Sequence, residues 1–364
     1  MLITDPGSSR RRWSGLAAGA AVLLIGCAHI GPGTVANDRF DFSTAIAESW
    51  KQQTLLSIVK LRYVDLPVFL DVGQIVSGYT FESGVSVSGQ IAPVNRGDTF
   101  AALGGRGTFT DRPTITYTPL TGDKFLRSLI SPIPTTAILY TLQSGYPADF
   151  MLGWTVESLN GLRNQPVAAA GPREADPKFV RALELMREIQ MAGGINLGVE
   201  RDKNKGETTV AVFRGDNLPR ATIEKSAELR RLLGLPSGQQ RFRVITSPGR
   251  APDGELAMQP RSLLQVMQAI GAYADVPPEH LARHWALPGV DAAAGGASDP
   301  GMRIHQSSTK PAASYAAVRY QGRWFWIDEG DLRSKRTLVL VILLFTLTDS
   351  GGGQNLPVLT IPTS

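Results

Sequence analysis

The sequence predicts an α+β fold in which antiparallel hairpins have helices packed on one face, together with a long N-terminal β-hairpin. Apolar and polar residues alternate with a period of two through 74–91 and 99–119, which is the pattern of strands. From residue 178 onward, helical and hairpin patterns follow one another, as expected for small antiparallel sheets covered by helices. With 364 residues, of which 43% are hydrophobic and 19% charged, the chain is long enough to bury a core.

The first 27 residues have the order of a bacterial export signal. Arg10, Arg11 and Arg12 precede an uncharged, mostly apolar run, Gly15 to Gly26, which is too short to span a bilayer comfortably as a helix. The run ends in Leu24-Ile25-Gly26-Cys27, which resembles the lipobox of bacterial lipoprotein precursors. This resemblance implies cleavage before Cys27, the only cysteine of the chain, and attachment of diacylglycerol to its sulfur. An ordinary secretory signal with a chance cysteine and a short membrane anchor are the alternatives.

Lipid attachment at Cys27 implies anchoring to a membrane through acyl chains such as palmitate. Ala28 follows the cysteine where an Asp tends to retain enteric-type lipoproteins at the inner membrane, so the resemblance favours the outer membrane. Three arginines before Trp13 also partly resemble a twin-arginine signal, which leaves the export route open between that pathway and the general one. Removing residues 1–26 takes away three arginines and one aspartate, so the formal charge falls from +5 to +3. That excess is too weak to suggest nucleic acid as a partner.

Composition divides the mature chain into segments. Residues 165–177 are rich in Pro and Ala, which is typical of a linker, and Ala, Gly, Ser and Pro dominate 287–312, which predicts a disordered insertion. The expected organisation is a signal peptide (1–26), a lipidated tether (27–38), an N-terminal α+β domain (39–164) with the long hairpin 74–119, a linker (165–177), and a C-terminal helix-hairpin domain (178–364) that carries the insertion.

The N-terminal domain is expected to begin with a helix. A broad apolar face predicts a helix over 41–63, with Ser43 as a plausible N-cap and Pro67 as its stop. Further helices are expected over 135–144 and 148–162.

Two interpretations of the long hairpin compete. In one, each subunit donates the hairpin to an oligomeric barrel, as the curli secretion channel does, with the apolar odd positions facing lipid. In the other, the hairpin is soluble, twisted and wet on one face. The second is favoured, because Asp111 and Pro113 fall on the apolar face and Phe100 on the polar face.

The C-terminal domain is expected to repeat a helix–hairpin order without any repeat of residues. The clearest hairpin turns on Gln321-Gly322, a dipeptide suited to a two-residue turn. The predicted helices are 178–191, 221–233, 260–273 and 331–347. The predicted strands are 195–200 with 207–213, 241–246 with 255–259, 313–320 with 323–328, and a last strand at 358–361.

Two stretches near the C-terminus carry a second resemblance. YQGRWFWIDEGDLRSKRT, residues 320–337, and LPVLTIP, residues 356–362, resemble an uncharacterised group of proteobacterial envelope lipoproteins. The resemblance runs from about Phe40 to the end of the chain. It implies a location in the cell envelope and brings no activity with it.

The search for catalytic chemistry yields one weak candidate. His280 and His284 stand four residues apart, so on a helix they would share a face and two imidazoles could hold zinc. A third ligand would have to come from elsewhere, such as His305 or Asp291, and a surface or capping role is the plainer interpretation. The chain has no G-x-S-x-G motif and no Walker loop, and its only thiol is assigned to lipid. We therefore expect no catalytic residue, no cofactor and no metal.

Three clusters near residue 330 each have a functional and a structural interpretation. Trp324, Phe325 and Trp326 fit a sugar-binding face, although core packing is the simpler explanation. A basic group could meet lipid phosphate or peptidoglycan carboxylates, or be a solvated helix face, and an acidic group fits charge at a helix start. The basic residues are Arg333, Lys335 and Arg336, and the acidic residues are Asp328, Glu329 and Asp331.

The combined expectation is a non-enzymatic, lipid-anchored periplasmic protein of the outer membrane, acting as a structural or assembly component of an envelope complex. Its partners would be membrane lipid through Cys27 and envelope proteins or further copies of itself. The alternative is a homo-oligomeric outer-membrane pore built from donated hairpins 74–119. A second alternative is an envelope hydrolase or ligand-binding lipoprotein.

Overall fold

The computed structural model describes residues 35–76, 79–90, 100–111, 114–120, 123–165, 175–202, 206–215, 217–290 and 301–348. Cys27, the signal peptide and the predicted strand 358–361 lie outside these residues. The chain forms two compact units, Met1–Lys51 and Gln52–Ser364. One helix, α2 (Val35–Arg62), contributes to both units; it confirms the predicted helix 41–63 but begins before Ser43, which is therefore not its N-cap.

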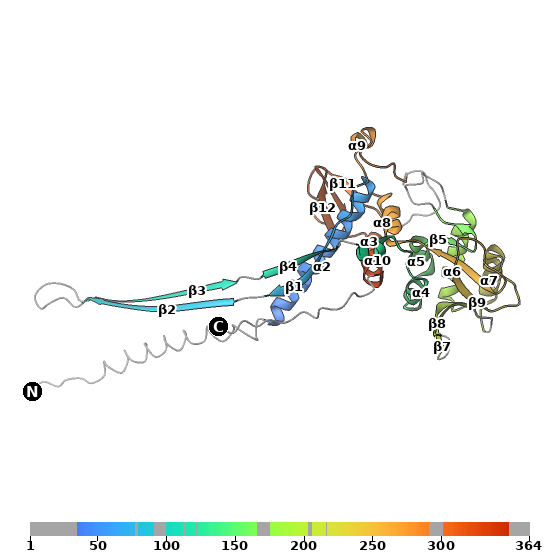
Figure 1. The fold of residues 1–364 in the computed structure, drawn as a ribbon, viewed down its shortest axis with the longest axis horizontal. Coiled ribbons are helices and arrows are strands. Elements are labelled where there is room, and N and C mark those ends of the chain that lie inside the picture. Colours follow the sequence, from blue (N-terminus) through green and yellow to red (C-terminus); the bar gives the residue numbers. More distant parts are fainter. Residues whose placement is uncertain are drawn as a thin grey trace, which may run out of the picture. The chain divides into compact units, whose positions relative to one another are not determined.

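The α+β class is confirmed in the described part of the chain, where helices alternate with antiparallel hairpins (Figure 1). The remaining helices are α3 (Asp123–Ile130), α4 (Thr135–Gln143), α5 (Ala148–Thr155), α6 (Pro177–Met191), α7 (Arg220–Leu233), α8 (Leu263–Gly271), α9 (Pro278–Ala282) and α10 (Leu332–Thr348). The strands are β1 (Phe69–Val76), β2 (Tyr79–Gln90), β3 (Phe100–Asp111), β4 (Thr114–Leu120), β5 (Val156–Leu159), β6 (Leu162–Arg163), β7 (Ile195–Asp202), β8 (Gly206–Phe213), β9 (Arg241–Thr246), β10 (Glu255–Pro260), β11 (His305–Ser307), β12 (Ala316–Tyr320) and β13 (Arg323–Ile327).

The long N-terminal hairpin consists of two antiparallel ladders, β1 with β4 and β2 with β3 (Figure 1). The alternation predicts two continuous strands, whereas the structure has four: β1 and β2 in the first stretch, and β3 and β4 in the second. In the β2–β3 ladder Tyr79 lies opposite Asp111 and Gln90 lies opposite Phe100, so odd positions pair with odd positions throughout. Residues directly opposite one another share a face of a sheet, and the alternating patterns of the two strands are therefore in phase.

The largest sheet has six strands in the order β6-β5-β10-β9-β8-β7 and takes strands from both sides of the predicted linker 165–177. The expected hairpin of 241–246 with 255–259 is wrong, because β9 and β10 pair in parallel and β5 lies antiparallel on the other side of β10. Leu256, Ala257 and Met258 are consecutive and fully buried. Such an unbroken apolar run is typical of a strand covered on both faces, where parallel pairing occurs.

The predicted helix 148–162 is wrong after residue 155, where the chain continues as β5, a turn and β6. The turn is made by Asn160 and Gly161, with φ of 48° and 89°, the conformation of a type I′ hairpin. The Asn160 side chain is buried and bonded on both ends: it donates to the Leu233 carbonyl at 2.5 Å and accepts from the Ala251 amide at 2.9 Å. These distant partners stabilise the turn against the helical pattern around it.

The core of the second unit is organised around α8, which contacts α3, α5 and α10. Ser262 caps α8 by accepting from the Gln265 amide, while the Gln265 side chain accepts from the Ser262 amide. At the other end of α8, a Cβ on Gly271 would lie 3.0 Å from the Ile58 carbonyl oxygen. Glycine there permits the close approach of α8 to α2.

A three-stranded sheet, in the order β11-β13-β12, forms near the C-terminus. The predicted hairpin around Gln321-Gly322 is confirmed, and both residues have positive φ, 46° and 78°. Strand β11 falls in the predicted disordered insertion 287–312, so the expectation of disorder is wrong for 301–312. The apolar side chains of Met302 and Ile304 are buried, which explains why this polar-looking segment is ordered.

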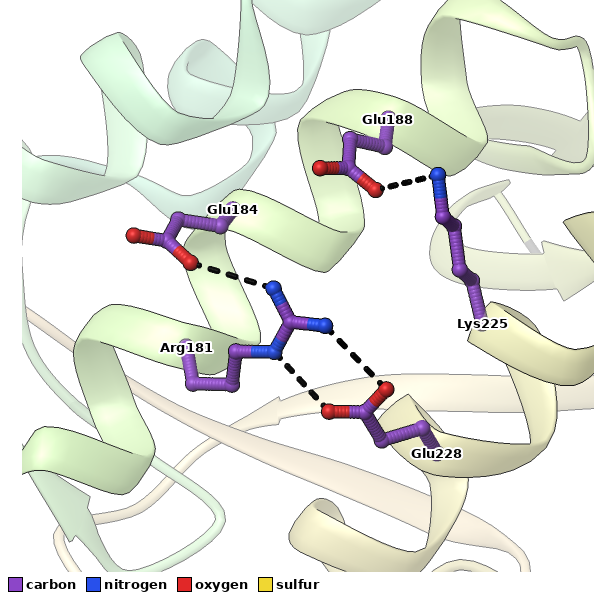
Figure 2. Close-up of polar contacts among 5 residues, drawn as sticks. All are labelled: Arg181, Glu184, Glu188, Lys225 and Glu228. Carbon is purple, nitrogen blue, oxygen red and sulfur yellow. Dashed lines mark hydrogen bonds and ion pairs between the residues drawn. The ribbon is translucent and has the colours of Figure 1, made fainter.

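Helices α6 and α7 are joined by surface ion pairs (Figure 2). The Arg181 guanidinium donates to Glu228 Oε1 at 2.8 Å and to Glu184 Oε2 at 3.2 Å, and Lys225 Nζ lies 2.7 Å from Glu188 Oε2. The hydrogen bond from Arg181 lowers the pKa of the Glu228 carboxyl and raises that of Arg181 itself. Pairs exposed to this extent contribute little stability, so they align the helices rather than hold the fold together.

Candidate functional site

The two histidines considered for metal binding do not share a helix face. Helix α9 ends at Ala282, and His284 has a left-handed φ of 55°. His280 is buried, and its Nδ1 lies 2.8 Å from the Tyr63 hydroxyl oxygen. His305 lies on β11 with Nδ1 3.7 Å from an oxygen of Asp275, while Asp291 is outside the described residues. Within the described part of the chain no three His, Cys, Asp or Glu side chains are grouped to hold a metal ion.

Tyr63, at the end of α2, is the centre of a buried aromatic cluster. Its ring makes edge contacts with His280, Tyr320 and Phe325 at centroid distances of 5.8, 5.2 and 6.1 Å. Burial, reinforced by the neighbouring Tyr320, raises the pKa of Tyr63 to about 12. The phenol is therefore a neutral hydrogen-bonding group at physiological pH, and the cluster joins α2, α9 and the β12–β13 hairpin.

The residues on either side of Tyr63 are held by further long-range contacts. Arg62 is buried and donates to the Pro288 carbonyl at 2.6 Å, and burial lowers the pKa of its guanidinium to about 10. Asp65 accepts from the Tyr320 hydroxyl at 2.9 Å, a hydrogen bond that lowers the pKa of its carboxyl. Arg62, Tyr63 and Asp65 each bond to a residue far along the chain, and these contacts fix the position of the chain where it leaves α2.

A strained turn connects α2 to the hairpin. The Val64 amide donates to the Leu61 carbonyl and the Asp65 amide to the Lys60 carbonyl, which is a Schellman motif. Val64 occupies its left-handed position with φ 57°, where glycine is usual and a β-branched residue is strained. Its side chain is 74% exposed, so no packing compensates for the strain.

The root of the long hairpin is fixed in the core of the second unit. Phe69, the first residue of β1, is 1% exposed and lies against Phe345 and Phe125, at centroid distances of 4.8 and 6.0 Å. Next to it, the Gln53 amide accepts from the Leu70 amide at 2.6 Å and donates to the Leu70 carbonyl at 3.0 Å. These two hydrogen bonds join the beginning of β1 to α2.

Exposed apolar side chains gather in the segments that lead into and out of this root. They are Val64, Leu66, Val68 and Leu70 before and within β1, and Leu126 and Ile130 on α3 after β4. Three of these six side chains, Val64, Leu66 and Ile130, are more than half exposed, and the other three are 40–49% exposed, whereas Phe69 is 1% exposed. The sequence pattern alone does not separate the exposed apolar residues from the buried Phe69, because all of them are apolar residues close to the end of a helix.

The aromatic cluster predicted at 324–326 is divided between two faces of the three-stranded sheet. Phe325 is fully buried against Tyr63, as the core interpretation expects. Trp324 and Trp326 are only partly covered, with Lys310 Nζ 5.6 Å from the Trp324 ring centroid and the His305 ring 5.4 Å from that of Trp326.

The charged clusters after β13 have structural partners. Asp331 Oδ1 accepts from the Ser334 amide at 3.0 Å and from the Arg333 amide at 3.1 Å at the start of α10. Lys335 pairs with Glu329, and the Arg336 guanidinium lies 5.8 Å from the Phe150 ring centroid. Asp331 therefore caps the start of α10, which agrees with the interpretation of this acidic group as charge at a helix start.

Within the described residues, no helix combines the length and the apolar character that a membrane span requires. The described part of the chain has a hairpin whose root is fixed in the core and an aromatic face that is partly exposed. Comparison with protein-family models, with curated proteins and with solved structures finds no match for this chain.

Proposed function

We propose that this chain is a lipid-anchored periplasmic protein of the outer membrane that acts, without catalysis, as a structural or assembly component of an envelope complex. Cys27 is its lipid attachment point, and the hairpin β1–β4 is the element that joins it to other chains. The observation that carries this proposal is the β2–β3 ladder, which has two strands and no third among the described residues.

A two-stranded ladder of this kind is incomplete by itself. In water an isolated hairpin is marginally stable at best, and three or more strands or a covering helix are needed for independent stability. The twelve residues of β2 and the twelve of β3 each leave one edge of backbone donors and acceptors without a strand partner in the described part of the chain. Such edges are templates for strands from other molecules.

The root of the hairpin is held by α2 within the second unit. The Gln53 side chain accepts a hydrogen bond from the Leu70 amide and donates one to the Leu70 carbonyl, and Phe69 beside it is buried. A hairpin that is fixed at its first residues can present its other strands to further chains, and lipid at Cys27 would keep the protein at a membrane surface.

A pair of variants tests the proposal. Cys27→Ser should release the protein from the outer-membrane fraction, which immunoblots of separated membranes will show. Joining Val76 directly to Thr114 through Asn-Gly should leave lipidation intact but abolish the large species on native gels in mild detergent. These two residues lie opposite each other in the β1–β4 ladder, so a two-residue turn closes it without strain. A shortened protein that still migrates in the large species would refute the role of the hairpin.

A homo-oligomeric pore is the second candidate, and the register of β2 with β3 is the one that it requires. Odd positions pair with odd positions over the whole ladder, so the mostly apolar and the mostly small, polar patterns each keep to one face. A lipid-facing strand needs only about 9–11 residues. Hairpins contributed by several copies would form a wall with an apolar outside and a polar lumen.

Single-cysteine labelling separates the pore from a soluble hairpin. The chain has only Cys27, so a new cysteine is the only free thiol after lipidation. In a pore, a membrane-impermeant maleimide should label Ser86→Cys and spare its neighbour Val85→Cys, which lies on the opposite face. Equal labelling of both positions in intact outer membranes would exclude the pore and leave the assembly role standing.

A further inference from the structure

The sheet β11-β13-β12 has one closed and one open face. Ala316, Val318, Phe325 and Ile327 lie on the closed face and are at most 8% exposed. The open face is defined by the register: on β13 it carries Trp324 and Trp326, on β11 the residues opposite them, Ser307 and His305, and on β12 Arg319 and Ala317. Members of the open face are all partly or fully exposed. Each indole on this face has one small residue opposite it on a neighbouring strand.

Each half-buried indole has one large and one small neighbour across the strands. Trp326 has His305 on its β11 side but only Ala317 on its β12 side. Trp324 has Arg319 on its β12 side but only Ser307 on its β11 side. The two rings are two residues apart on one strand, which corresponds to about 7 Å. They form a row of two partly exposed rings, each with a small residue on one side.

Two cations border this row, and neither has a carboxylate partner among the described residues. Lys310 Nζ lies 5.6 Å from the Trp324 ring centroid, and Arg319 lies directly opposite Trp324. By contrast, Arg323 on the same sheet is paired with Glu279, and Arg241 on the large sheet is paired with Glu200. A surface that combines apolar ring faces with unpaired positive charge is complementary to a ligand that has apolar and anionic parts.

We propose that the open face binds peptidoglycan, with the sugar strand on the indoles and the carboxylates of the attached stem peptides beside the cations. Sugar rings present C–H groups on their flat sides, which pack on indole faces as other apolar surfaces do. Two rings in a row suit successive sugars of one strand, and Lys310 and Arg319 suit carboxylates of the peptides attached to that strand. The choice of peptidoglycan rests on the periplasmic location proposed above, whereas the ligand chemistry rests on this face alone.

Co-sedimentation of the full-length, detergent-solubilised protein with purified peptidoglycan sacculi tests the proposal. The double variant Trp324→Ala/Trp326→Ala should bind at least tenfold more weakly. Trp285→Ala is the matched control, because Trp285 is 46% exposed but lies after α9 and not on this sheet, and this variant should bind as the unmodified protein does. Lys310→Gln with Arg319→Gln should weaken binding severalfold and remove most of its salt dependence, whereas Lys310→Arg should not.

Several results would overturn the proposal. Unchanged binding by the double tryptophan variant would exclude this face, as would an equal loss in Trp285→Ala. Should the double variant lose its fold, Trp324→Phe/Trp326→Phe keeps the ring faces and must retain binding. Preferential binding to lipopolysaccharide micelles over sacculi would replace the ligand class and reject peptidoglycan. Outer-membrane fractionation of the same variants reports the proposed function separately, because it depends on Cys27 and not on the tryptophans.

Discussion

Two antiparallel hairpins of this chain, β12–β13 and β2–β3, have opposite relations to the rest of the molecule. The first is short, closes on Gln321-Gly322, gains a third strand from β11, and buries Phe325 against Tyr63. The second has twelve residue pairs and gains no third strand within the described residues. One hairpin is completed by its own chain and contributes to the core. The other gains no further strand in the part of the chain that the structure describes, so its outer edges are without strand partners there.

Phe325→Ala should have the largest effect on stability, because it removes a fully buried ring from the completed hairpin. We expect a loss of about 3–5 kcal/mol in the free energy of unfolding, from lost burial plus the cavity left behind. Chemical denaturation followed by circular dichroism measures it. Trp324→Ala, on the open face of the same strand, is the control and should cost clearly less. Equal losses would mean that the two faces of this sheet do not differ as described.

Tyr63→Phe should come next, because it deletes only a hydroxyl but leaves His280 Nδ1 buried without its partner. We expect a cost of about 1–3 kcal/mol, the usual penalty for an unsatisfied buried polar group. Tyr140→Phe provides the control, since the Tyr140 hydroxyl bonds to Glu207 at an exposed position. A comparable loss in both variants would show that the Tyr63–His280 contact has no special weight.

Because of Tyr63, the free energy of unfolding should depend on pH in the alkaline range. The pKa of Tyr63 is raised to about 12 in the folded protein, from an ordinary value of 10.0. The stabilisation it provides is therefore complete below pH 10 and is lost as pH rises from 10 towards 12, because the unfolded chain ionises first. Unfolding midpoints measured across this window should fall less steeply for Tyr63→Phe than for the unmodified protein. Parallel curves would contradict the assignment.

Val64→Gly should stabilise the root of the incomplete hairpin. Glycine adopts the left-handed conformation that costs valine roughly 1–2 kcal/mol, and part of this gain is offset by the greater freedom of glycine when unfolded. We expect a net gain of about 0.5–1 kcal/mol by thermal or chemical denaturation. Val64→Ala, which keeps a Cβ, should not show it. If the strained conformation of Val64 is needed to direct the hairpin, Val64→Gly will also form less of the large species on native gels.

Replacing residues 77–113 by Asn-Gly should have the smallest effect on stability. The β2–β3 ladder has no third strand from the described chain, so its removal should change the unfolding of the remainder by less than about 0.5 kcal/mol. Denaturation in detergent, where the anchored protein is dispersed, makes the comparison. A large loss would show that the long hairpin is part of the folding unit and would remove the contrast between the two hairpins.

Much of the fold was predictable because its signals are local. Helices such as 178–191 and the hairpin at Gln321-Gly322 follow from periodicity and turn chemistry, which depend on neighbouring residues. The errors arose where a distant partner decides the conformation. Asn160 turns the chain because Leu233 and Ala251 satisfy its side chain, and β10 lies between β9, which is parallel to it, and β5, which comes from a distant part of the chain.

The candidate sites divide in the same way. Pairing of His280 with His284 assumed a helix that continues to residue 284, but α9 ends at Ala282 and His280 is engaged by Tyr63, 217 positions away. The tryptophans at 324 and 326 were visible as aromatic residues, yet only the register of β11 and β12 shows that small residues flank them. Identity of a residue is local information, whereas its exposure is not.

By itself, the sequence determined the α+β class, the single cysteine placed in a lipobox-like motif, the alternation that forms the long hairpin, and the absence of familiar catalytic motifs. Those features depend on residue type and short-range spacing. Only the tertiary structure decided that one hairpin is completed and the other is not, that Phe325 is buried while its neighbours are open, and that Gln53 holds the hairpin root. Burial and edge pairing are set by contacts between segments far apart in the chain, and no local pattern encodes which of them will meet.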